Sequence, residues 1–343
     1  MTVLITGGAG VFGRAMINYL FDRGYRDIRS LDIAPLPQML ATKVHEIRGD
    51  IRNLYDVRIA MQSVDFVIHA AAALPSYKNE EIFSIDVLGT KTLLHQALAS
   101  NVKRFIHLSS TAVYGVPDKV PSSEEDERLP YDAYNSAKIE AELACEEYRQ
   151  IGLQVAILRP KAFLGPGRLG LFGMLFEWAY EGHHFPVVGS GEVPYQFLHV
   201  SDLCAVTDLA MQHPCANDTF NIAAHEFTTV REDFQAVLDA AGHGKRIIPL
   251  PLRPAAFILQ ALEATRLSPV YKRLYLKLVS GSYVETAKAK DILGFSARYS
   301  NKDALLETYR WYCDNRPSLS KETGVSHTSL WKQGALRIGK TVL

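Results

Sequence analysis

Short apolar runs alternate with longer amphipathic segments along the first third of the chain. The apolar runs have the length and composition of buried strands, and they cover residues 2–6, 28–31, 44–47, 65–72 and 104–109. Segments with helical periodicity separate them, most plainly at residues 82–100. Repeated strand–helix units predict an α/β fold with a doubly wound parallel sheet, the Rossmann architecture. Ligands of such sheets bind at the carboxyl ends of the strands.

A glycine-rich turn follows the first predicted strand. It contains Gly7, Gly10 and Gly13, and a helical pattern begins within it at Val11 and Phe12. Glycines allow the backbone to come close to a pyrophosphate, while the helix N-terminus offers amide N–H groups and the positive end of its dipole. A strand, a glycine turn and a helix in this order predict a dinucleotide-binding site.

The second predicted strand ends at Asp32, and no arginine follows it directly. A carboxylate at this place accepts hydrogen bonds from the ribose hydroxyls of NAD and repels the 2′-phosphate of NADP. We therefore expect NAD, the competing interpretation being a plain glycine turn with a solvated aspartate. Asp50 and Ile51 occupy a later strand-to-helix turn, where a carboxylate could meet the adenine amino group. His69 is expected to be a packed histidine, because nothing else in the sequence suggests a metal.

Tyr134 and Lys138 form a candidate acid–base pair. Their spacing of four residues places both side chains on one face of a helix, about one turn apart. A free tyrosine, with a pKa of about 10, is a poor base at neutral pH. A neighbouring ammonium favours the phenolate, so such a pair can move the proton of an alcohol. The spacing alone also fits an exposed helix face, but the dinucleotide site and a strand-end hydroxyl, Ser110, accompany it.

Together these motifs resemble the extended short-chain dehydrogenase/reductases, the epimerase/dehydratase superfamily. The resemblance runs from residue 1 to about residue 315 in the family's order. It is carried by Thr6–Gly13, His69–Ala72, Ser109–Gly115, Tyr134-x-x-x-Lys138, Leu158-Arg159-Pro160, Gly165-Pro166-Gly167, Phe197–Asp202, Phe220-Asn221-Ile222 and Ile292–Phe295.

The resemblance implies an NAD-dependent enzyme in which Tyr134 is the catalytic base. Lys138 would favour the phenolate and bond the nicotinamide ribose. The family's catalytic hydroxyl stands four residues before the tyrosine of Val-Tyr-Gly, which is Ser110 here, with Thr111 as the second choice. The implied cofactor contacts are Gly7, Gly10, Val11, Phe12, Gly13, Asp32, Asp50, Ile51, Ala70, Ala71, Ala72, Leu74, Ser109, Tyr134, Lys138 and Pro160.

Three positions depart from the family pattern. Members that act on nucleotide-diphosphate sugars usually carry Asn where Ala162 stands and tend to carry Arg where Tyr195 stands. Both changes remove groups that would hold a diphosphate, which needs paired cationic or amide donors. The third departure is Asp86, at a position where Asn is usual and is thought to support the active-site helix.

The pattern is more similar to the 3β-hydroxysteroid dehydrogenase branch, which includes the sterol 4-carboxylate 3-dehydrogenases. Arg159–Pro166, His69–Thr90 and Ile248-Pro249 carry this similarity. It implies oxidation of a secondary alcohol of a sterol or similar polycyclic lipid, and a carboxylate beta to the new ketone could then leave as carbon dioxide. The implied substrate contacts are Leu74, Pro75, Ala112, Ala162, Phe163 and Tyr195.

Two other functions stay open from the sequence. One is a nucleotide-sugar epimerase, dehydratase or decarboxylase that holds its diphosphate through Arg168 or Lys161. The other is a non-catalytic, NAD-sensing scaffold on the same fold. A sensor needs only the cofactor cradle, so the complete set of Ser110, Tyr134 and Lys138 argues against it.

Composition and charge narrow the possible partners. The chain has 37 Lys and Arg against 37 Asp and Glu, so its net charge gives no drive toward nucleic acid. Its cysteines, scattered without a Cys-x-x-Cys motif, predict reduced thiols and no metal site. Neither a signal peptide nor an apolar stretch of about 20 residues is evident, so a cytoplasmic location is expected.

We expect two domains. Residues 1–160 with parts of 195–225 would bind NAD, and residues 161–194 with 226–315 would form a smaller, mostly helical substrate lobe. The tail, 316–343, lies outside the resemblance.

Two surfaces carry expectations about partners. A homodimer through the helices at 82–100 and 134–150 is the family's habit. Residues 252–280 combine apolar and basic side chains. They fit either ordinary lobe helices or a surface that rests on a membrane or admits a lipid-like substrate.

Overall fold

The computed structural model describes residues 1–117, 119–170, 172–255 and 280–319, together with 323–324, 330–331 and 340. Most of the apolar, basic stretch 252–280 and most of the tail 316–343 therefore lie outside the described residues. Within the described ones, no helix is both long enough and apolar enough to cross a bilayer.

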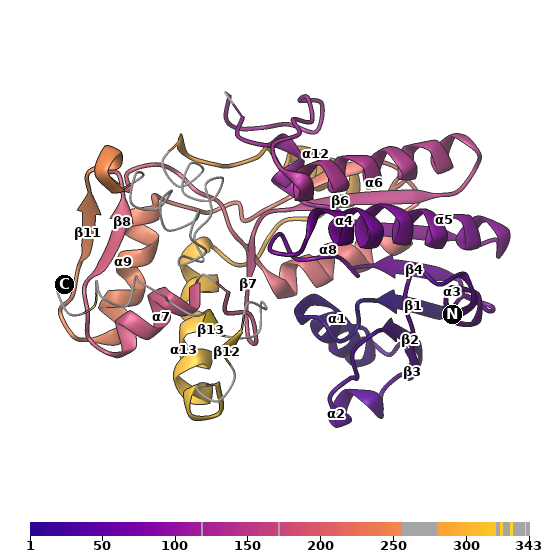
Figure 1. Ribbon diagram of the computed structural model, residues 1–343, viewed down its shortest axis with the longest axis horizontal. Helices are drawn as coiled ribbons and strands as arrows, with labels where there is room; N and C mark the ends of the chain where they lie inside the picture. Colours follow the sequence, from indigo (N-terminus) through magenta and orange to yellow (C-terminus); the bar gives the residue numbers. More distant parts are fainter. Residues whose placement is uncertain are drawn as a thin grey trace.

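A seven-stranded parallel sheet forms the larger body of the protein (Figure 1). In order across the sheet, its strands are β3 (His45–Arg48), β2 (Asp27–Asp32), β1 (Thr2–Thr6), β4 (Phe66–His69), β5 (Arg104–Leu108), β6 (Val155–Pro160) and β10 (Thr219–Ile222). All five predicted apolar runs form strands of this sheet. The chain order reverses between β1 and β4, where doubly wound sheets bind their ligands. The predicted Rossmann architecture is confirmed.

Helices cover both faces of the sheet. On one face lie α1 (Val11–Asp22), α2 (Gln38–Ala41) and α8 (Val200–Gln212). On the other lie α3 (Leu54–Ala60), α5 (Thr90–Ala99) and α6 (Ala133–Gln150). Successive residues of a strand point to opposite faces, so Ile5 joins the core under α1 and α8 while Leu4 joins the core under α3 and α5.

The helix predicted at residues 82–100 has three parts. They are α4 (Asn79–Phe83), a π-helical turn η1 (Ser84–Gly89) and α5. Such turns are rare and often lie at functional sites. Here the turn buries the side chain of Asp86 and leaves Leu88 exposed.

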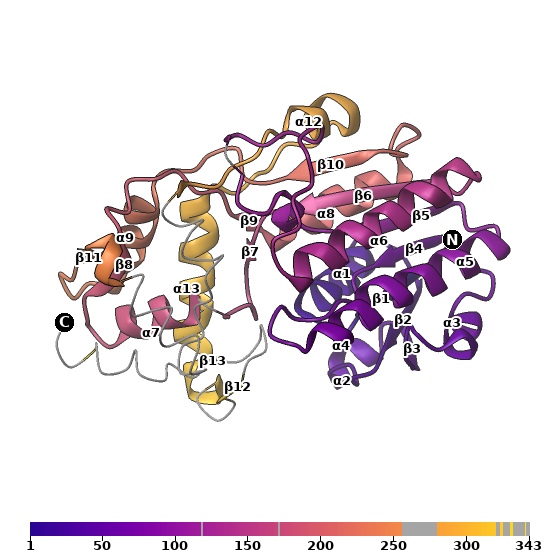
Figure 2. The same ribbon diagram turned by 45° about the horizontal axis from the view of Figure 1, so that its top comes forward.

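A smaller lobe follows β6 (Figure 2). It contains α7 (Phe172–Tyr180), α9 (Val230–Ala241) and α13 (Asn301–Leu319), with the parallel strands β8 (Phe185–Val188) and β11 (Ile247–Leu250). Local signals set the ends of α9: Thr229 and Glu232 form a capping box, and Gly242 ends the helix in a left-handed conformation. Phe176, Phe197 and Tyr312 lie in the core of this lobe.

A short pair of strands lies between the two bodies: β7 (Phe163–Leu164) pairs with β9 (Leu198–His199), and both contact α8 and α13. A second short pair, β12 (Thr323–Gly324) with β13 (Leu330–Trp331), lies beside α7 of the smaller lobe. α12 (Ala287–Leu293) falls within the range expected for the substrate lobe, yet it packs against β10 and α8 of the large sheet. The reason is its apolar side: Ala289 and Leu293 are buried in the same core as Phe220.

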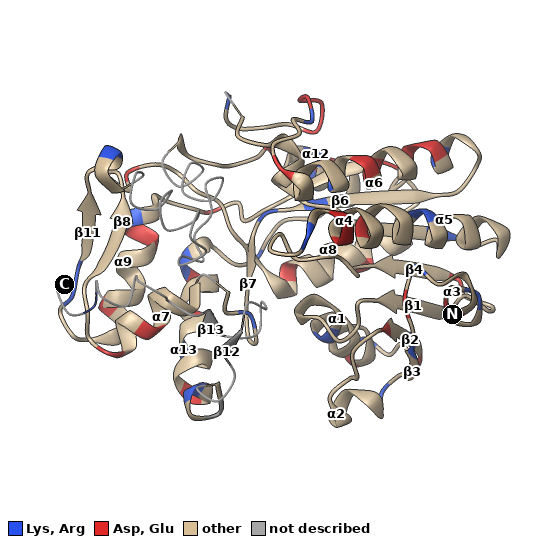
Figure 3. Ribbon diagram, viewed as in Figure 1, with Lys and Arg blue, Asp and Glu red and all other residues tan. Residues whose placement is uncertain are grey.

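Basic and acidic residues are interspersed along the described helices (Figure 3). This distribution agrees with the balanced charge of the sequence.

Candidate active site

The glycine turn between β1 and α1 has almost no room for side chains. Gly7 has a φ of +74°, and a Cβ there would lie 2.6 Å from the backbone nitrogen of Ala71. A Cβ on Gly13 would lie 2.2 Å from the carbonyl oxygen of Gly7. Gly10 precedes α1, whose N-terminus has no side-chain cap. The first-turn N–H groups can therefore bind an anion, and the turn fits the pyrophosphate of NAD.

Asp32 ends β2 beside this turn. Its Oδ2 accepts a hydrogen bond from the N–H of Ala9 at 2.9 Å, and its Oδ1 accepts one from Ala34 at 2.8 Å. The carboxylate thus holds the glycine turn and keeps lone pairs for ribose hydroxyls. The sequence reasoning missed Arg48, which pairs with Asp32 in the register of β3 and β2 and whose guanidinium donates to the carbonyl of Ile33.

Asp50 forms an ion pair with Arg52, whose Nη2 lies 2.5 Å from Oδ2. Hydrogen bonds from Arg52, together with its charge, hold the pKa of Asp50 below its usual value. The neighbouring Ile51 is buried and contacts Gly89 of η1, where a Cβ would lie 2.5 Å from its Cδ1. A contact of Asp50 with adenine stays a prediction.

His69 ends β4 in a fully packed position. Its Nδ1 lies 2.8 Å from the hydroxyl of Thr6, and its Nε2 lies 2.8 Å from the hydroxyl of Thr90. Burial, helped by the charge of Lys138, lowers the pKa of His69 to about 3. Among the described residues, no group of His, Cys, Asp and Glu could hold a metal ion.

The backbone after His69 leads along the edge of the glycine turn. Ala70 donates to the carbonyl of Thr6 at 3.2 Å, and Ala71 donates to the Thr6 hydroxyl at 3.3 Å. Ala71 is half-buried and Ala72 is exposed. Because both side chains are only methyl groups, a ligand can come close to the backbone of this segment.

Tyr134 and Lys138 lie on the first turns of α6. Asp132 caps this helix by accepting from the N–H of Asn135 at 2.9 Å, and the Asn135 side chain donates to the carbonyl of Ala112. The Lys138 Nζ is 5.7 Å from the centre of the Tyr134 ring. Lys138 is buried while Tyr134 is partly exposed, so the structure brings the predicted pair together and leaves part of Tyr134 accessible.

Asp86 reaches Lys138 from η1. The Lys138 Nζ lies 3.4 Å from Oδ2 of Asp86, and Oδ1 accepts a hydrogen bond from the N–H of Ala73 at 2.8 Å. Burial works to lower the pKa of Lys138, but the charge of Asp86 and its contact with the ammonium outweigh burial, and the pKa is raised. Lys138 is therefore a cation.

Three consecutive hydroxyl residues follow β5, and their environments differ. Ser109 donates to Glu142 at 2.5 Å and is buried. Thr111 is also buried, and its hydroxyl points at the carbonyl of Pro160 at 3.4 Å. Ser110 caps the short helix η2 (Thr111–Tyr114) by accepting from Ala112 at 3.1 Å, and it is partly exposed. Ser110 is thus the most available of the three.

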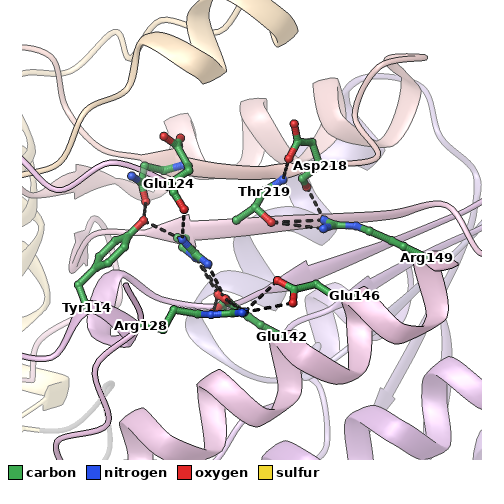
Figure 4. A network of polar contacts seen from close by, with 11 residues as sticks. Tyr114, Glu124, Arg128, Glu142, Glu146, Arg149, Asp218 and Thr219 are labelled. Atoms are coloured by element: carbon green, nitrogen blue, oxygen red, sulfur yellow. Dashed lines mark hydrogen bonds and ion pairs between the residues drawn. The ribbon is translucent and has the colours of Figure 1, made fainter. Parts of the chain in front are cut away.

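A buried polar network anchors α6 behind the site (Figure 4). Glu142, one turn after Lys138, is fully buried and binds Arg159 at 2.7 Å. Arg159 also donates to the hydroxyl of Tyr114 at 2.8 Å. The sequence reasoning missed Glu142, although its place one turn after the lysine was a usable signal.

A cavity of about 610 Å³ adjoins this network. It is lined mainly by charged side chains of the 124–128 loop, α6, β6 and α12, with Asp218 and Thr219 at the start of β10. None of the glycine-turn residues lines it, so it is separate from the candidate cofactor site.

The predicted substrate residues lie beyond β6. Tyr195 is buried in the lobe core, and the Lys161 Nζ lies 4.6 Å from its ring centre. Lys161 donates to the carbonyl and hydroxyl of Ser282 at 2.9 and 2.7 Å. Ala162 is exposed and Phe163 half-buried, and the Arg168 guanidinium lies 3.9 Å from the Phe163 ring centre. The ammonium of Lys161 is thus engaged within the protein.

The remaining predicted contacts, Leu74 and Pro75, are half-buried after β4, while Ala112 is buried in η2. Their contact with substrate stays a prediction.

Comparisons with known proteins agree with this geometry. The model of the NAD dependent epimerase/dehydratase family matches residues 3–223. The chain is 36% identical over 339 residues to the uncharacterized protein y4nG of Sinorhizobium fredii, covering 98% of this chain and 85% of that one. It is 28% identical over 346 residues to a 3-beta-hydroxysteroid dehydrogenase of Mycolicibacterium neoaurum, covering 91% of each. The structure of MoeE5 with UDP-glucuronic acid and NAD superposes with a TM-score of 0.75 at 26% identity, covering 93% of this chain and 100% of that one.

Proposed function

The chain belongs to the NAD dependent epimerase/dehydratase family, and on that premise we propose that it interconverts a secondary alcohol and its ketone. It is an NAD-dependent enzyme of the extended short-chain dehydrogenase/reductase type. When bound, NAD supplies the acceptor for the hydride of a carbinol carbon. The observation that carries the proposal is the buried Lys138 cation beside the partly exposed phenol of Tyr134, one helix turn apart.

The residues around this pair have separate roles in the proposal. Tyr134 takes the hydroxyl proton of the substrate or returns it, and Lys138 favours the phenolate that forms. Ser110 orients the substrate oxygen through its hydroxyl. The tight turn at Gly7 and Gly13 supports a pyrophosphate contact, and Asp32 supports a ribose contact that favours NAD over NADP. Asp32→Ala should therefore relax the preference for NAD, as measured by titration with both cofactors.

For the substrate we favour a 3β-hydroxysteroid or a similar polycyclic lipid. The support is the absence of diphosphate-binding residues at Ala162 and Tyr195, and the engagement of Lys161 with Ser282. The relative from Mycolicibacterium neoaurum points the same way. A polycyclic lipid gains roughly 25 cal/mol per Å² of apolar surface removed from water, so it needs an apolar cleft more than ionic anchors. Loss of a 4-carboxylate could follow oxidation.

A nucleotide sugar is the competing substrate class. MoeE5 was crystallised with UDP-glucuronic acid and NAD, and its likeness to this chain favours that class. Arg168, next to Phe163, is the cation that could serve a diphosphate.

The two classes can be separated by thermal unfolding with NAD present, using a panel of sterols against a panel of nucleotide sugars. The proposal expects a rise in Tm with at least one sterol. Stabilisation by nucleoside diphosphates or their sugars, with none from any sterol, would leave the sugar function standing instead.

We also propose that the protein is a homodimer through α5 and α6. The support is that large apolar side chains are exposed to solvent on this side of the sheet: Leu88 of η1 is 59% exposed and Leu143 of α6 is 42% exposed.

A further inference from the structure

A chain of buried polar contacts leads from the glycine turn to the lysine of the candidate catalytic pair. It passes through Thr6, His69, Thr90 and Asp86 and ends at Lys138, and each of these residues is at most 3% exposed. Thr6 ends β1 at the glycine turn, Asp86 lies in η1, and Thr90 begins α5. The chain therefore joins the turn that fits the cofactor to the interior side of α6.

The contacts determine which group donates at each step of the chain. The Thr90 hydroxyl donates to the carbonyl oxygen of Asp86 at 2.6 Å, which uses its one proton. Nε2 of His69 lies 2.8 Å from the Thr90 hydroxyl oxygen, so it is the donor of that bond. Burial lowers the pKa of His69 to about 3, so the ring carries a single proton at pH 7. Its Nδ1 therefore accepts the Thr6 hydroxyl at 2.8 Å.

Both ends of the chain meet the backbone that follows β4. The Thr6 hydroxyl oxygen accepts the N–H of Ala71 at 3.3 Å, and Oδ1 of Asp86 accepts the N–H of Ala73 at 2.8 Å. This segment runs along the glycine turn. Oδ2 of Asp86 lies 3.4 Å from the Lys138 Nζ. One connected network therefore holds both this edge of the turn and the ammonium of Lys138.

Thr90 is the link of the chain that can be removed with the least change of shape. Its hydroxyl bonds the backbone of Asp86 within the π-helical turn η1, which directs the Asp86 side chain inward. Valine has nearly the shape of threonine but lacks the hydroxyl. It would leave Nε2–H of His69 buried without this acceptor, which costs free energy. The carboxylate beside Lys138 would then be held less firmly.

We propose that His69 and Thr90, acting through Asp86, hold Lys138 in position for the bound cofactor. This inference rests on the proposed function in placing Lys138 among the groups that meet NAD. An ammonium has three N–H donors, so Asp86 can orient it without using all of them. His69 and Thr90 are positioning residues, because their effect passes through Asp86. The affinity for NADH should therefore depend on Thr90 while the ammonium of Lys138 is present, and cease to depend on it once that ammonium is removed.

A double-mutant cycle on NADH binding tests this coupling. The full chain is titrated with NADH, and binding is followed by the fluorescence of the reduced nicotinamide. The four proteins are the unchanged chain, Thr90→Val, Lys138→Met and the double variant. We expect Thr90→Val alone to raise the Kd for NADH about tenfold, and to cause no further rise in the Lys138→Met protein. Circular dichroism checks that each variant is folded.

Thr92→Val is the matched control. The Thr92 hydroxyl also donates to the carbonyl four residues earlier, that of Leu88, at 2.9 Å, but this bond is exposed to solvent. The control should leave the Kd for NADH unchanged. Thr90→Ser keeps the hydroxyl and should bind NADH as the unchanged chain does. His69→Gln removes the ring at the centre of the chain, and its effect should depend on Lys138 in the same way.

Three results would overturn the proposal. One is a folded Thr90→Val protein that binds NADH as tightly as the unchanged chain. Another is a rise in Kd by the same factor with and without Lys138, because it would show that Thr90 acts independently of the ammonium. The third is an equal rise in Thr92→Val. The titration needs no substrate, so its result is separate from whether the proposed alcohol–ketone activity is found.

Discussion

Ser109, Ser110 and Thr111 are chemically similar neighbours, yet their surroundings separate them. Ser109 is engaged with Glu142 and Thr111 faces the carbonyl of Pro160, whereas Ser110 is partly exposed at the end of the strand. A hydroxyl that orients a substrate oxygen has to be reachable from the cofactor side. The family spacing pointed to Ser110 first, and the burial of Thr111 supports that order.

Substitution at these two hydroxyls should therefore have unequal effects. Ser110→Ala should lower kcat on the order of a hundredfold, the cost of losing one donor to the reacting oxygen. Thr111→Val, which keeps the shape of the side chain, should change kcat by much less. Steady-state kinetics of both variants would measure this, and an equal loss in the two would contradict the assignment of Ser110.

At the scale of secondary structure, local patterns predicted the strands well because apolar runs and turn residues are neighbours in the chain. They could not predict η1, since residues 82–100 satisfy the periodicity of a continuous helix. The direction of Asp86 depends on that extra π turn. The partners of Glu142 could not be predicted from local patterns either, because Ser109 is 33 residues away and Arg159 is 17 residues away. Such pairs form only once β5, β6 and α6 are packed.

Glu142 should matter for the stability of α6. Replacing one partner of a buried ion pair leaves the other charge uncompensated, which costs about 3–5 kcal/mol. Glu142→Gln should therefore lower the free energy of unfolding by about 3 kcal/mol in urea titrations at pH 7. Glu140→Gln, on the exposed side of the same helix, is the control. A loss no larger than that of the control would show that the network is not stabilising.

His69 should make stability depend on pH. Its pKa is lowered from 6.5 to about 3 in the folded protein, so below pH 6.5 the unfolded chain binds a proton that the folded chain excludes. Stability should fall as pH drops from 6.5 toward 3, by up to about 1.4 kcal/mol per pH unit from this group. His69→Gln cannot titrate, so its unfolding free energy should fall less steeply between pH 7 and pH 5. Parallel pH profiles for the two proteins would contradict this.

At the scale of the whole molecule, the proposed dimer rests on the exposed apolar side chains near α5 and α6. Leu143→Asp should give a monomer in light scattering, because it introduces a charge into the proposed contact. Leu209→Asp is the control, since Leu209 is 39% exposed on α8, which covers the opposite face of the sheet. A monomeric unchanged protein, or a Leu143 variant that stays dimeric, would rule out this interface.

The most direct measurement of the proposed activity is hydride transfer itself. The protein would be incubated with NAD and a 3β-hydroxysteroid that carries deuterium on the carbinol carbon. The deuterium content of the NADH formed would then be measured by mass spectrometry. We expect deuterium in the reduced cofactor and a ketone product, with transfer reduced by a factor of about 10²–10⁴ in Tyr134→Phe while NAD binding persists. No deuterium transfer from any sterol, in a preparation that turns over a nucleotide sugar, would contradict it.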